Sequence, residues 1–374
     1  MLSPITFGGA PRTITRPEAI LQALIPIEST VSNEAGFIKL GGEHMKRKAL
    51  VLSPESRLKE VCSDKCRALL NEHFDVTWNE TGKDYTKEEL AGMASDAEVI
   101  ITSWGSPSLS EDALEKATKL RAVGHAAGTV KNLVPKQIFS RGVRVFSAAP
   151  RIALSVGEYC LAALLVSLRH LTTLDASLRA GQWRELGLKG RELTGSTIGI
   201  ISASSTARAF INLLAPFQVN VLIYDPYLSE EAAASLNAKR ATLEEVMSCP
   251  IISVHAPKLP ATERMLTREL LARIPDGAVF INSSRGPVVD EKAFMDELQS
   301  GRFFAALDVF EKEPLAADSP IRSLPNVLLT PHVAGASVQG HLSLMEEVVK
   351  DIIRGLNEEK TSYEVSEKMW EVMA

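Results

Sequence analysis

The sequence lacks the features that would direct it to a nucleic acid, a membrane or an oxidising compartment. Its 374 residues carry 41 Lys and Arg against 46 Asp and Glu, so no basic field is present to bind phosphate backbones. The longest uncharged apolar run, 159–168, is too short to cross a bilayer. The four cysteines match neither a zinc site nor a disulfide framework. These absences favour a cytoplasmic α/β enzyme or binding protein without a nucleic-acid or membrane partner.

Residues 1–44 also lack a sustained hydrophobic period. They contain four prolines and a Gly8-Gly9 pair, and they have neither the basic start nor the continuous apolar core of a secretory signal. We therefore expect a poorly ordered N-terminal extension, with a regulatory arm as the alternative.

Two series of short apolar runs that alternate with helical stretches follow this extension. The series span 45–150 and 151–335, and their alternation is typical of parallel sheets covered by helices on both faces. An amphipathic stretch at 340–356 predicts a helix that returns to the first domain, so that 336–374 complete it. A long helix, 155–180, is expected to pack between domains or subunits. The predicted strands are 49–53, 74–78, 98–102, 121–125, 143–147, 197–202, 219–225, 251–255, 278–283, 303–308 and 327–330.

Glycine is missing from the loop where a dinucleotide site would need it. The predicted strand 197–202 leads into a helix, and dinucleotide folds place G-x-G-x-x-G/A at this junction. Here the three marker positions hold Ser202, Ser204 and Ala207. By itself, a strand, turn and helix with small polar residues is more typical of an ordinary connector.

Polar groups at this junction can replace part of what the glycines do. The N–H groups of Ser205 and Thr206 at the helix N-terminus attract anions, and the Ser204 hydroxyl can donate to phosphate. Asp225 ends the next predicted strand, where a carboxylate accepts hydrogen bonds from ribose hydroxyls and repels a 2′-phosphate. Together these residues predict an NAD site and not an NADP site.

Three polar residues follow successive predicted strands at the edge where open α/β sheets bind ligands. They are Arg285, Glu313 and His332. An arginine fork binds a carboxylate or keto oxygen, a histidine carries a proton, and a glutamate orients that histidine. Each alone is typical of a surface charge or a cap, but the three together predict an anion-binding acid/base set without a metal.

Four longer motifs are more specific. They read VHAP at 254–257, FINSSRGPVVD at 280–290, ALDVFEKEP at 306–314 and LTPH at 329–332. On these motifs the chain from 49 to 356 resembles the D-isomer-specific 2-hydroxyacid dehydrogenases. The resemblance implies NAD-dependent interconversion of a small D-2-hydroxy acid and its 2-keto acid. It also implies a homodimer of chains that each have a Rossmann-like cofactor domain, a flavodoxin-like substrate domain and a cleft between them.

The resemblance further implies roles for single residues. Arg285 binds the substrate, His332 moves the proton with Glu313 as its partner, and Asp308 lies near the nicotinamide carboxamide. Backbone N–H groups around Ala127 and Gly128 bind the substrate carboxylate, although the stretch after Gly128 lacks the family's aspartate. The residues expected at the cofactor are Ser204, Ser205, Thr206, Asp225, His255, Ser283, Ser284, Arg285, Asp308, His332 and Gly335.

Two alternatives remain open. The altered loop at Ser202 and Ser204 is compatible with a non-catalytic NAD(H)-sensing or scaffold protein on the same fold. A degenerate paralogue that binds a different anion between its domains is the other. A formate-dehydrogenase relative is disfavoured, because that branch lacks the partner that Glu313 supplies.

Overall fold

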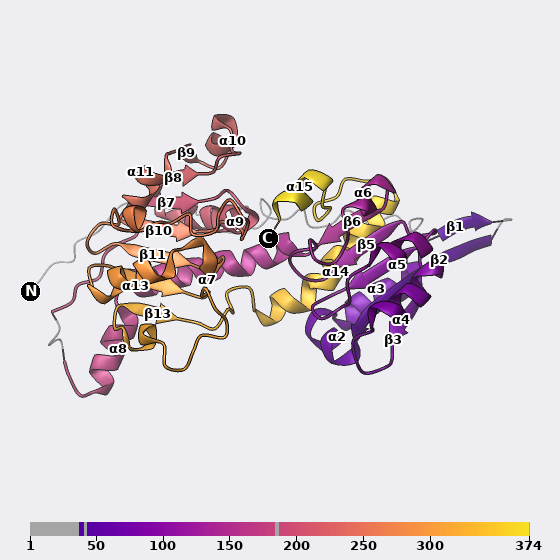
Figure 1. Cartoon of the computed structure of the whole chain (residues 1–374), viewed down its shortest axis with the longest axis horizontal. Helices are drawn as coiled ribbons and strands as arrows, with labels where there is room; N and C mark the ends of the chain where they lie inside the picture. Colours follow the sequence, from indigo (N-terminus) through magenta and orange to yellow (C-terminus); the bar gives the residue numbers. More distant parts are fainter. Residues whose placement is uncertain (1–36, 41–42, 184–186, 374) are drawn as a thin grey trace, which may run out of the picture.

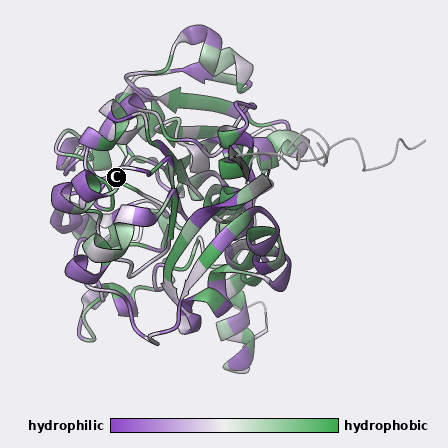
Figure 2. Cartoon of the chain, turned by 90° about the vertical axis from the view of Figure 1, so that its right-hand side faces the viewer, coloured by the Kyte–Doolittle hydropathy of each residue, from purple (hydrophilic) through white to green (hydrophobic). Residues whose placement is uncertain are grey.

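The computed structural model describes residues 37–40, 43–183 and 187–373, which form two α/β domains joined by two long helices (Figure 1). One domain contains the first part of the chain together with the C-terminal part, and the other contains the segment between them. In Figure 2 the strands inside the molecule are mostly hydrophobic, whereas the outer helices also carry hydrophilic residues. The predicted α/β class with two doubly wound sheets is confirmed.

The first domain has a parallel sheet in the order β3-β2-β4-β5-β6, which is the flavodoxin-like arrangement. A further strand, β1, pairs with the start of β2 in the antiparallel direction. Residues 37–40 and 43–44 of the expected extension are therefore strand, while 1–36 and 41–42 lie outside the described residues. The strands are β1 (Phe37–Leu40), β2 (Glu43–Pro54), β3 (Phe74–Asn79), β4 (Val99–Thr102), β5 (Ala122–His125) and β6 (Arg144–Ser147).

Helices bury both faces of this sheet. One core lies between the strands and α2, α3 and α14, and the other lies between the strands and α4, α5, α6 and α15. The C-terminal helices α14 and α15 thus pack on the sheet of the first domain. Their bounds are α2 (Glu55–Val61), α3 (Asp64–His73), α4 (Lys87–Met93), α5 (Glu111–Lys116), α6 (Gln137–Ser140), α14 (Val338–Leu356) and α15 (Glu367–Val372).

The second domain has seven parallel strands in the order β13-β12-β11-β10-β7-β8-β9. This is the Rossmann order with one more strand at the β13 edge, and the order reverses between β7 and β10, where such sheets bind ligands. The short strand β9 was not predicted. The strands are β7 (Thr197–Ile201), β8 (Asn220–Tyr224), β9 (Ala238–Arg240), β10 (Ile251–Val254), β11 (Val279–Asn282), β12 (Phe304–Leu307) and β13 (Val327–Leu329).

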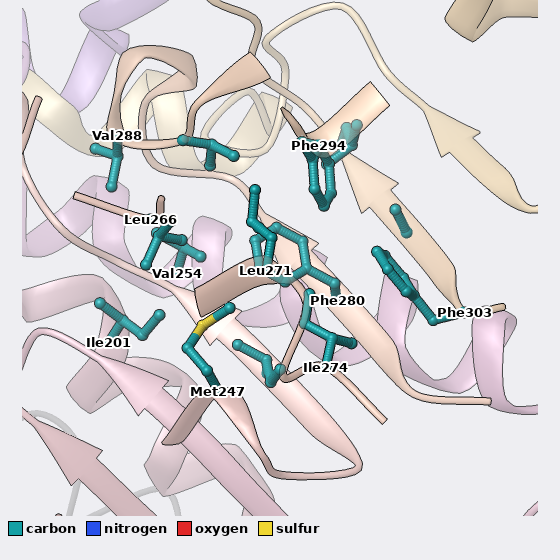
Figure 3. Close-up of a cluster of buried hydrophobic side chains, with 14 of the residues drawn as sticks. Ile201, Met247, Val254, Leu266, Leu271, Ile274, Phe280, Val288, Phe294 and Phe303 are labelled. Atoms are coloured by element: carbon teal, nitrogen blue, oxygen red, sulfur yellow. The ribbon is translucent and has the colours of Figure 1, made fainter. Parts of the chain in front are cut away.

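This second sheet also has a core on each face. Figure 3 shows the core beneath α11, α12 and α13, in which the Phe280 and Phe294 rings lie 4.8 Å apart. The opposite core lies between the sheet and α7 and α9. The helices are α7 (Ala149–Leu168), α9 (Ser205–Leu214), α10 (Glu230–Ser235), α11 (Leu243–Met247), α12 (Arg268–Leu271) and α13 (Glu291–Gln299).

The helices α7 and α14 run between the domains (Figure 1). The predicted helix 155–180 begins too late and is not continuous. The helix α7 begins at Ala149 and ends at Leu168, and His170, with a φ of 52°, separates it from α8 (Leu171–Arg179). By length and composition α7 could span a membrane, but half of that stretch is buried in the structure. Ile152 of α7 packs against the cores of both domains. The position of α7 thus fits a core helix that couples the two domains.

Candidate active site

His332 and Glu313 form a hydrogen-bonded pair at the carboxyl edge of the seven-stranded sheet. Nδ1 of His332 lies 2.7 Å from Oε2 of Glu313, and Oε1 of Glu313 accepts the N–H of Phe310 at 3.0 Å. The two side chains are 49% and 35% exposed, so a ligand can reach them. Because Nδ1 is engaged, Nε2 is the ring nitrogen that can exchange a proton with a bound molecule.

A buried carboxylate holds the loop that carries His332. Asp308 is fully buried, and its carboxylate accepts hydrogen bonds from the Thr330 hydroxyl at 2.6 Å and from the N–H groups of Val333 and Ala334 at 2.8 Å. Its carbonyl accepts the N–H of His332 at 2.8 Å. Both carboxylate oxygens of Asp308 are thus engaged within the loop. The expected place of Asp308 near the nicotinamide carboxamide stays a prediction.

Arg285 lies in the loop after the neighbouring strand β11. The Asn282 side chain fixes this loop: its Oδ1 accepts the N–H of Ser284 at 3.1 Å, and its Nδ2 donates to the carbonyl of Arg285 at 3.2 Å. The guanidinium donates to the Ser284 carbonyl at 2.7 Å. Burial lowers the pKa of Arg285, and the nearby charge of Glu313 opposes that shift. An arginine remains charged in this setting, so it can bind an anion.

The loops of Arg285 and Glu313 touch through a glycine. A Cβ on Gly286 would lie 1.9 Å from the carbonyl carbon of Phe310, a distance that no side chain can occupy. The N–H of Phe310 is also the group that holds Glu313. The adjacent strands β11, β12 and β13 thus bring Arg285, Glu313 and His332 to one edge of the sheet.

The loop after β7 adopts the turn that a dinucleotide motif assigns to glycine. Ser202 has a φ of 75°, in the left-handed region that side chains disfavour. Its N–H donates to the Tyr224 carbonyl at 2.7 Å. The Asp225 carboxylate accepts the N–H of Ala203 at 2.8 Å and the N–H of Tyr227 at 2.8 Å. Oδ2 of Asp225 also accepts the Ser202 hydroxyl at 3.4 Å. Asp225 therefore stabilises the turn, and its Oδ1 keeps a lone pair for a ribose hydroxyl.

The N-terminus of α9 points out of this turn with free donors. Within the part of the chain that the structure describes, the N–H groups of Ser205 and Thr206 have no hydrogen-bond acceptor. The hydroxyls of Ser204 and Thr206 lie 3.0 Å apart. A helix N-terminus with unpaired N–H groups and hydroxyls is a donor set that fits the pyrophosphate of a dinucleotide.

His255 does not line the site, contrary to expectation. Its ring is only 3% exposed, and both nitrogens are engaged: Nδ1 by the Thr206 hydroxyl at 3.1 Å and Nε2 by the Ser253 hydroxyl at 2.9 Å. Ser283 is likewise buried, and its hydroxyl lies 3.1 Å from Sγ of Cys160 in α7. The side chains of these two residues are buried beneath the loops of the site and do not face a ligand.

The loop after β5 offers backbone donors from the other domain. Among the described residues, no acceptor lies within hydrogen-bond reach of the N–H groups of Ala127, Gly128 and Thr129. The buried Ser147 hydroxyl donates to the carbonyl of Gly128, so this carbonyl points toward the interior of the domain. Successive free N–H groups in a turn form a concave site for an anion such as a carboxylate.

Ile152 connects this loop to the His332 loop. A Cβ on Gly128 would lie 4.0 Å from Cδ1 of Ile152, and one on Gly335 would lie 2.9 Å from Cγ2 of the same side chain. Gly335, expected at the cofactor, therefore packs closely against α7. In the described parts of the chain, no group of three or more His, Cys, Asp or Glu residues could hold a metal ion.

Comparison with known proteins decides the family. Residues 161–334 match the family model described as "D-isomer specific 2-hydroxyacid dehydrogenase, NAD binding domain". The chain is 32% identical over 282 residues to D-3-phosphoglycerate dehydrogenase of Methanocaldococcus jannaschii, which is 74% of this chain and 53% of that protein. The chain belongs to the D-isomer-specific 2-hydroxyacid dehydrogenase family.

Other members of this family match over more of their own length. Hydroxypyruvate reductase of Thermotoga maritima is 28% identical over 280 residues, which cover 74% of this chain and 90% of that protein. A solved phosphoglycerate oxidoreductase from Rhizobium etli is 28% identical with a TM-score of 0.75, and the match covers 86% of this chain and 99% of that one. The chain spans only about half the length of the D-3-phosphoglycerate dehydrogenases that it matches.

Two residues beside the site were not predicted from the sequence. Arg208, in the first turn of α9, donates from Nε to the Ala203 carbonyl at 3.0 Å, which places a cation beside the dinucleotide loop. Tyr159 of α7 lies 2.7 Å from the Thr330 hydroxyl and so braces the Asp308 contact. Arg208 could have been predicted, because it lies only a few residues after the nucleotide loop in the sequence. The contact of Tyr159 could not, because its partner Thr330 is 171 residues away in the sequence.

Proposed function

We propose that the protein is an NAD-dependent dehydrogenase that interconverts a small D-2-hydroxy acid and its 2-keto acid. The observation that carries the proposal is the 2.7 Å contact of His332 with Glu313, next to the loop of Arg285 at the edge of a dinucleotide-binding sheet. A proton-transfer pair and an anion-binding arginine are the groups that this reaction needs from the protein. When bound, the nicotinamide supplies or accepts the hydride.

The chain's own residues have distinct tasks in this proposal. Nε2 of His332 gives a proton to the keto oxygen during reduction and takes it back during oxidation. Glu313 holds the ring through Nδ1 and stabilises the imidazolium form. Arg285 binds the carboxylate or carbonyl of the substrate, and the free N–H groups of Ala127 and Gly128 bind the carboxylate from the other domain. This assignment places the substrate between the domains.

The cofactor would be held by the loop after β7. The N–H groups of Ser205 and Thr206 would bind the pyrophosphate, and Asp225 the adenosine ribose. A carboxylate at that position disfavours a 2′-phosphate, which supports NAD over NADP. Ser284, next to Arg285, lies in the half-buried loop where the nicotinamide ribose is expected.

A scaffold or NAD(H)-sensing role is the second candidate, supported by the two serines at glycine positions. It leaves the His332–Glu313 pair without a purpose. The discriminating experiment is absorbance at 340 nm with NADH and a panel that contains glyoxylate, hydroxypyruvate, pyruvate and a phosphorylated 2-keto acid. Reduction of at least one acid supports the enzyme, whereas NADH binding without reduction of any acid supports the sensor. Hydroxypyruvate and the phosphorylated acid enter the panel because of the names that the relatives carry.

We also propose that the enzyme is a cytoplasmic homodimer. The helix α8 exposes Leu171, Leu174 and Leu178, which are spaced so that they share one face of the helix. Trp183, which is 71% exposed, follows them. An exposed apolar stripe on the cofactor domain is suited to a second copy of the same helix.

A further inference from the structure

A chain of four polar side chains runs from the surface of the nucleotide loop into the core of the second domain. The hydroxyls of Ser204 and Thr206 lie 3.0 Å apart, and the Thr206 hydroxyl lies 3.1 Å from Nδ1 of His255. Nε2 of His255 lies 2.9 Å from the hydroxyl of Ser253, which is fully buried. Ser204 and Thr206 are partly exposed, so only one end of the chain meets a ligand.

The buried imidazole carries a single N–H. The Phe210 ring lies 5.8 Å from the imidazole of His255 and contributes to its burial. Burial lowers the pKa of His255 to about 3, so the imidazole is neutral near neutral pH. A neutral imidazole donates from one nitrogen and accepts at the other. The protonated nitrogen of His255 therefore sets the proton order, which is the donor and acceptor direction of each hydrogen bond between these four side chains.

The two orders have opposite consequences at the surface. With the proton on Nε2, Nδ1 accepts the Thr206 proton and Thr206 can accept the Ser204 proton, so that both hydroxyl protons point inward. With the proton on Nδ1, His255 donates to the Thr206 oxygen, and the protons of Thr206 and Ser204 are free to point outward. Phosphate oxygens only accept hydrogen bonds, so an anion at the loop favours the second order.

We propose that His255 is a positioning residue for the cofactor, which donates from Nδ1 to Thr206 and so turns the Thr206 and Ser204 hydroxyls into donors for the pyrophosphate. This inference rests on the proposed NAD-binding function and specifies how the site works without its glycines. A loop with glycine at position 204 binds the pyrophosphate through bare backbone. Here side-chain hydroxyls occupy that approach, and a buried ring fixes the direction of their protons.

The test compares variants that differ in one group of the chain. Thr206→Val removes the hydroxyl, and Thr206→Ser is the matched control that keeps it. His255→Leu removes the donor, and His255→Asn places an amide N–H near the position of Nδ1. We expect Thr206→Val and His255→Leu to weaken NADH and ADP binding at least about tenfold, because hydrogen bonds to a charged group are lost. Thr206→Ser and His255→Asn should stay close to the wild type.

Adenosine separates this effect from general damage to the site. It lacks phosphate, so its weak binding, followed by ligand-detected NMR, should not change in any variant whose melting temperature shows that it is folded. A ¹⁵N NMR spectrum of the ADP complex should show His255 protonated at Nδ1. A proton at Nε2, or equal ADP affinity of Thr206→Val and Thr206→Ser, would overturn the inference while leaving NAD binding in place. Wild-type protein that binds neither NADH nor ADP would remove the proposed function as well.

Discussion

Oε2 of Glu313 lies 2.7 Å from Nδ1 of His332, while Oε1 of the same carboxylate accepts the N–H of Phe310. The glutamate is therefore held on one side by backbone and holds the imidazole on the other. This leaves Nε2 of His332 as the nitrogen that exchanges the substrate proton. A fixed ring orientation matters because proton transfer requires donor and acceptor within hydrogen-bond distance.

Replacement of His332 by Ala should lower kcat for 2-keto acid reduction by about 10²- to 10⁴-fold, the usual contribution of a general acid. The affinity for NADH should be unchanged, because the imidazole acts on the substrate. Steady-state kinetics and NADH fluorescence titration measure the two effects. Lys312→Ala, next to Glu313, is the control, and a His332→Ala enzyme with wild-type kcat would exclude the assigned role.

Asp308→Asn should destabilise the protein by about 2–4 kcal/mol, because an amide must place NH₂ against an N–H or hydroxyl donor that the carboxylate now accepts. Denaturant unfolding monitored by circular dichroism measures the change. Asp318→Asn, at an exposed position, should leave the stability unchanged. Equal stability of both variants would mean that Asp308 is not the support of the His332 loop.

Ser202→Gly should stabilise the protein by about 0.5–1 kcal/mol, because Ser202 has a φ of 75°, which glycine adopts without strain. Ser204 has a φ of −62°, so Ser204→Gly gains nothing from its backbone. Thermal unfolding of the two variants tests this difference. Tighter NADH binding by the double glycine variant would indicate that the serines are tolerated losses. Weaker binding would indicate that they are fitted contacts.

Stability should fall as the pH drops from about 6.5 to 5. Burial lowers the pKa of His125 to about 4 and that of His255 to about 3, so the folded protein leaves both neutral in this range. The unfolded chain protonates them near 6.5, which favours unfolding by about 1.4 kcal/mol per pH unit for each histidine. Urea unfolding at several pH values measures the slope. It should be smaller in His255→Asn, and an equal slope would contradict the buried neutral state.

Leu174→Asp combined with Leu178→Asp should convert a homodimer into a monomer, because charges on the exposed face of α8 cannot be buried at an interface. Light scattering coupled to size exclusion gives the mass. Tyr227→Asp changes a hydrophobic residue that is more exposed than either leucine and should leave the mass unchanged. A wild-type monomer would contradict the expected assembly.

Most of the fold was predictable because it rests on local signals. Apolar runs at the strands and polar residues after them identified two α/β domains, and each predicted strand overlaps an observed one. The largest difference is at β2, which begins at Glu43 and not at 49. The break between α7 and α8 at His170 was not predictable in this way, since no proline or glycine marks it. It results from the positive φ of His170 alone. The strands β1 and β9 were missed because they are short edge strands with little apolar periodicity.

The sequence by itself determined which residues could carry the chemistry. Arg285, Glu313 and His332 follow three strands, and parallel strands in sequence order place their ends on one edge. Only the tertiary structure decided which of these residues face a ligand and which support the loops, because their burial and hydrogen-bond partners come from segments distant in the sequence. It turned Asp308 into a support of the His332 loop, and it placed His255 beneath Thr206, 49 residues away in the sequence. No local pattern encodes such a contact, since it depends on how β10 and α9 pack.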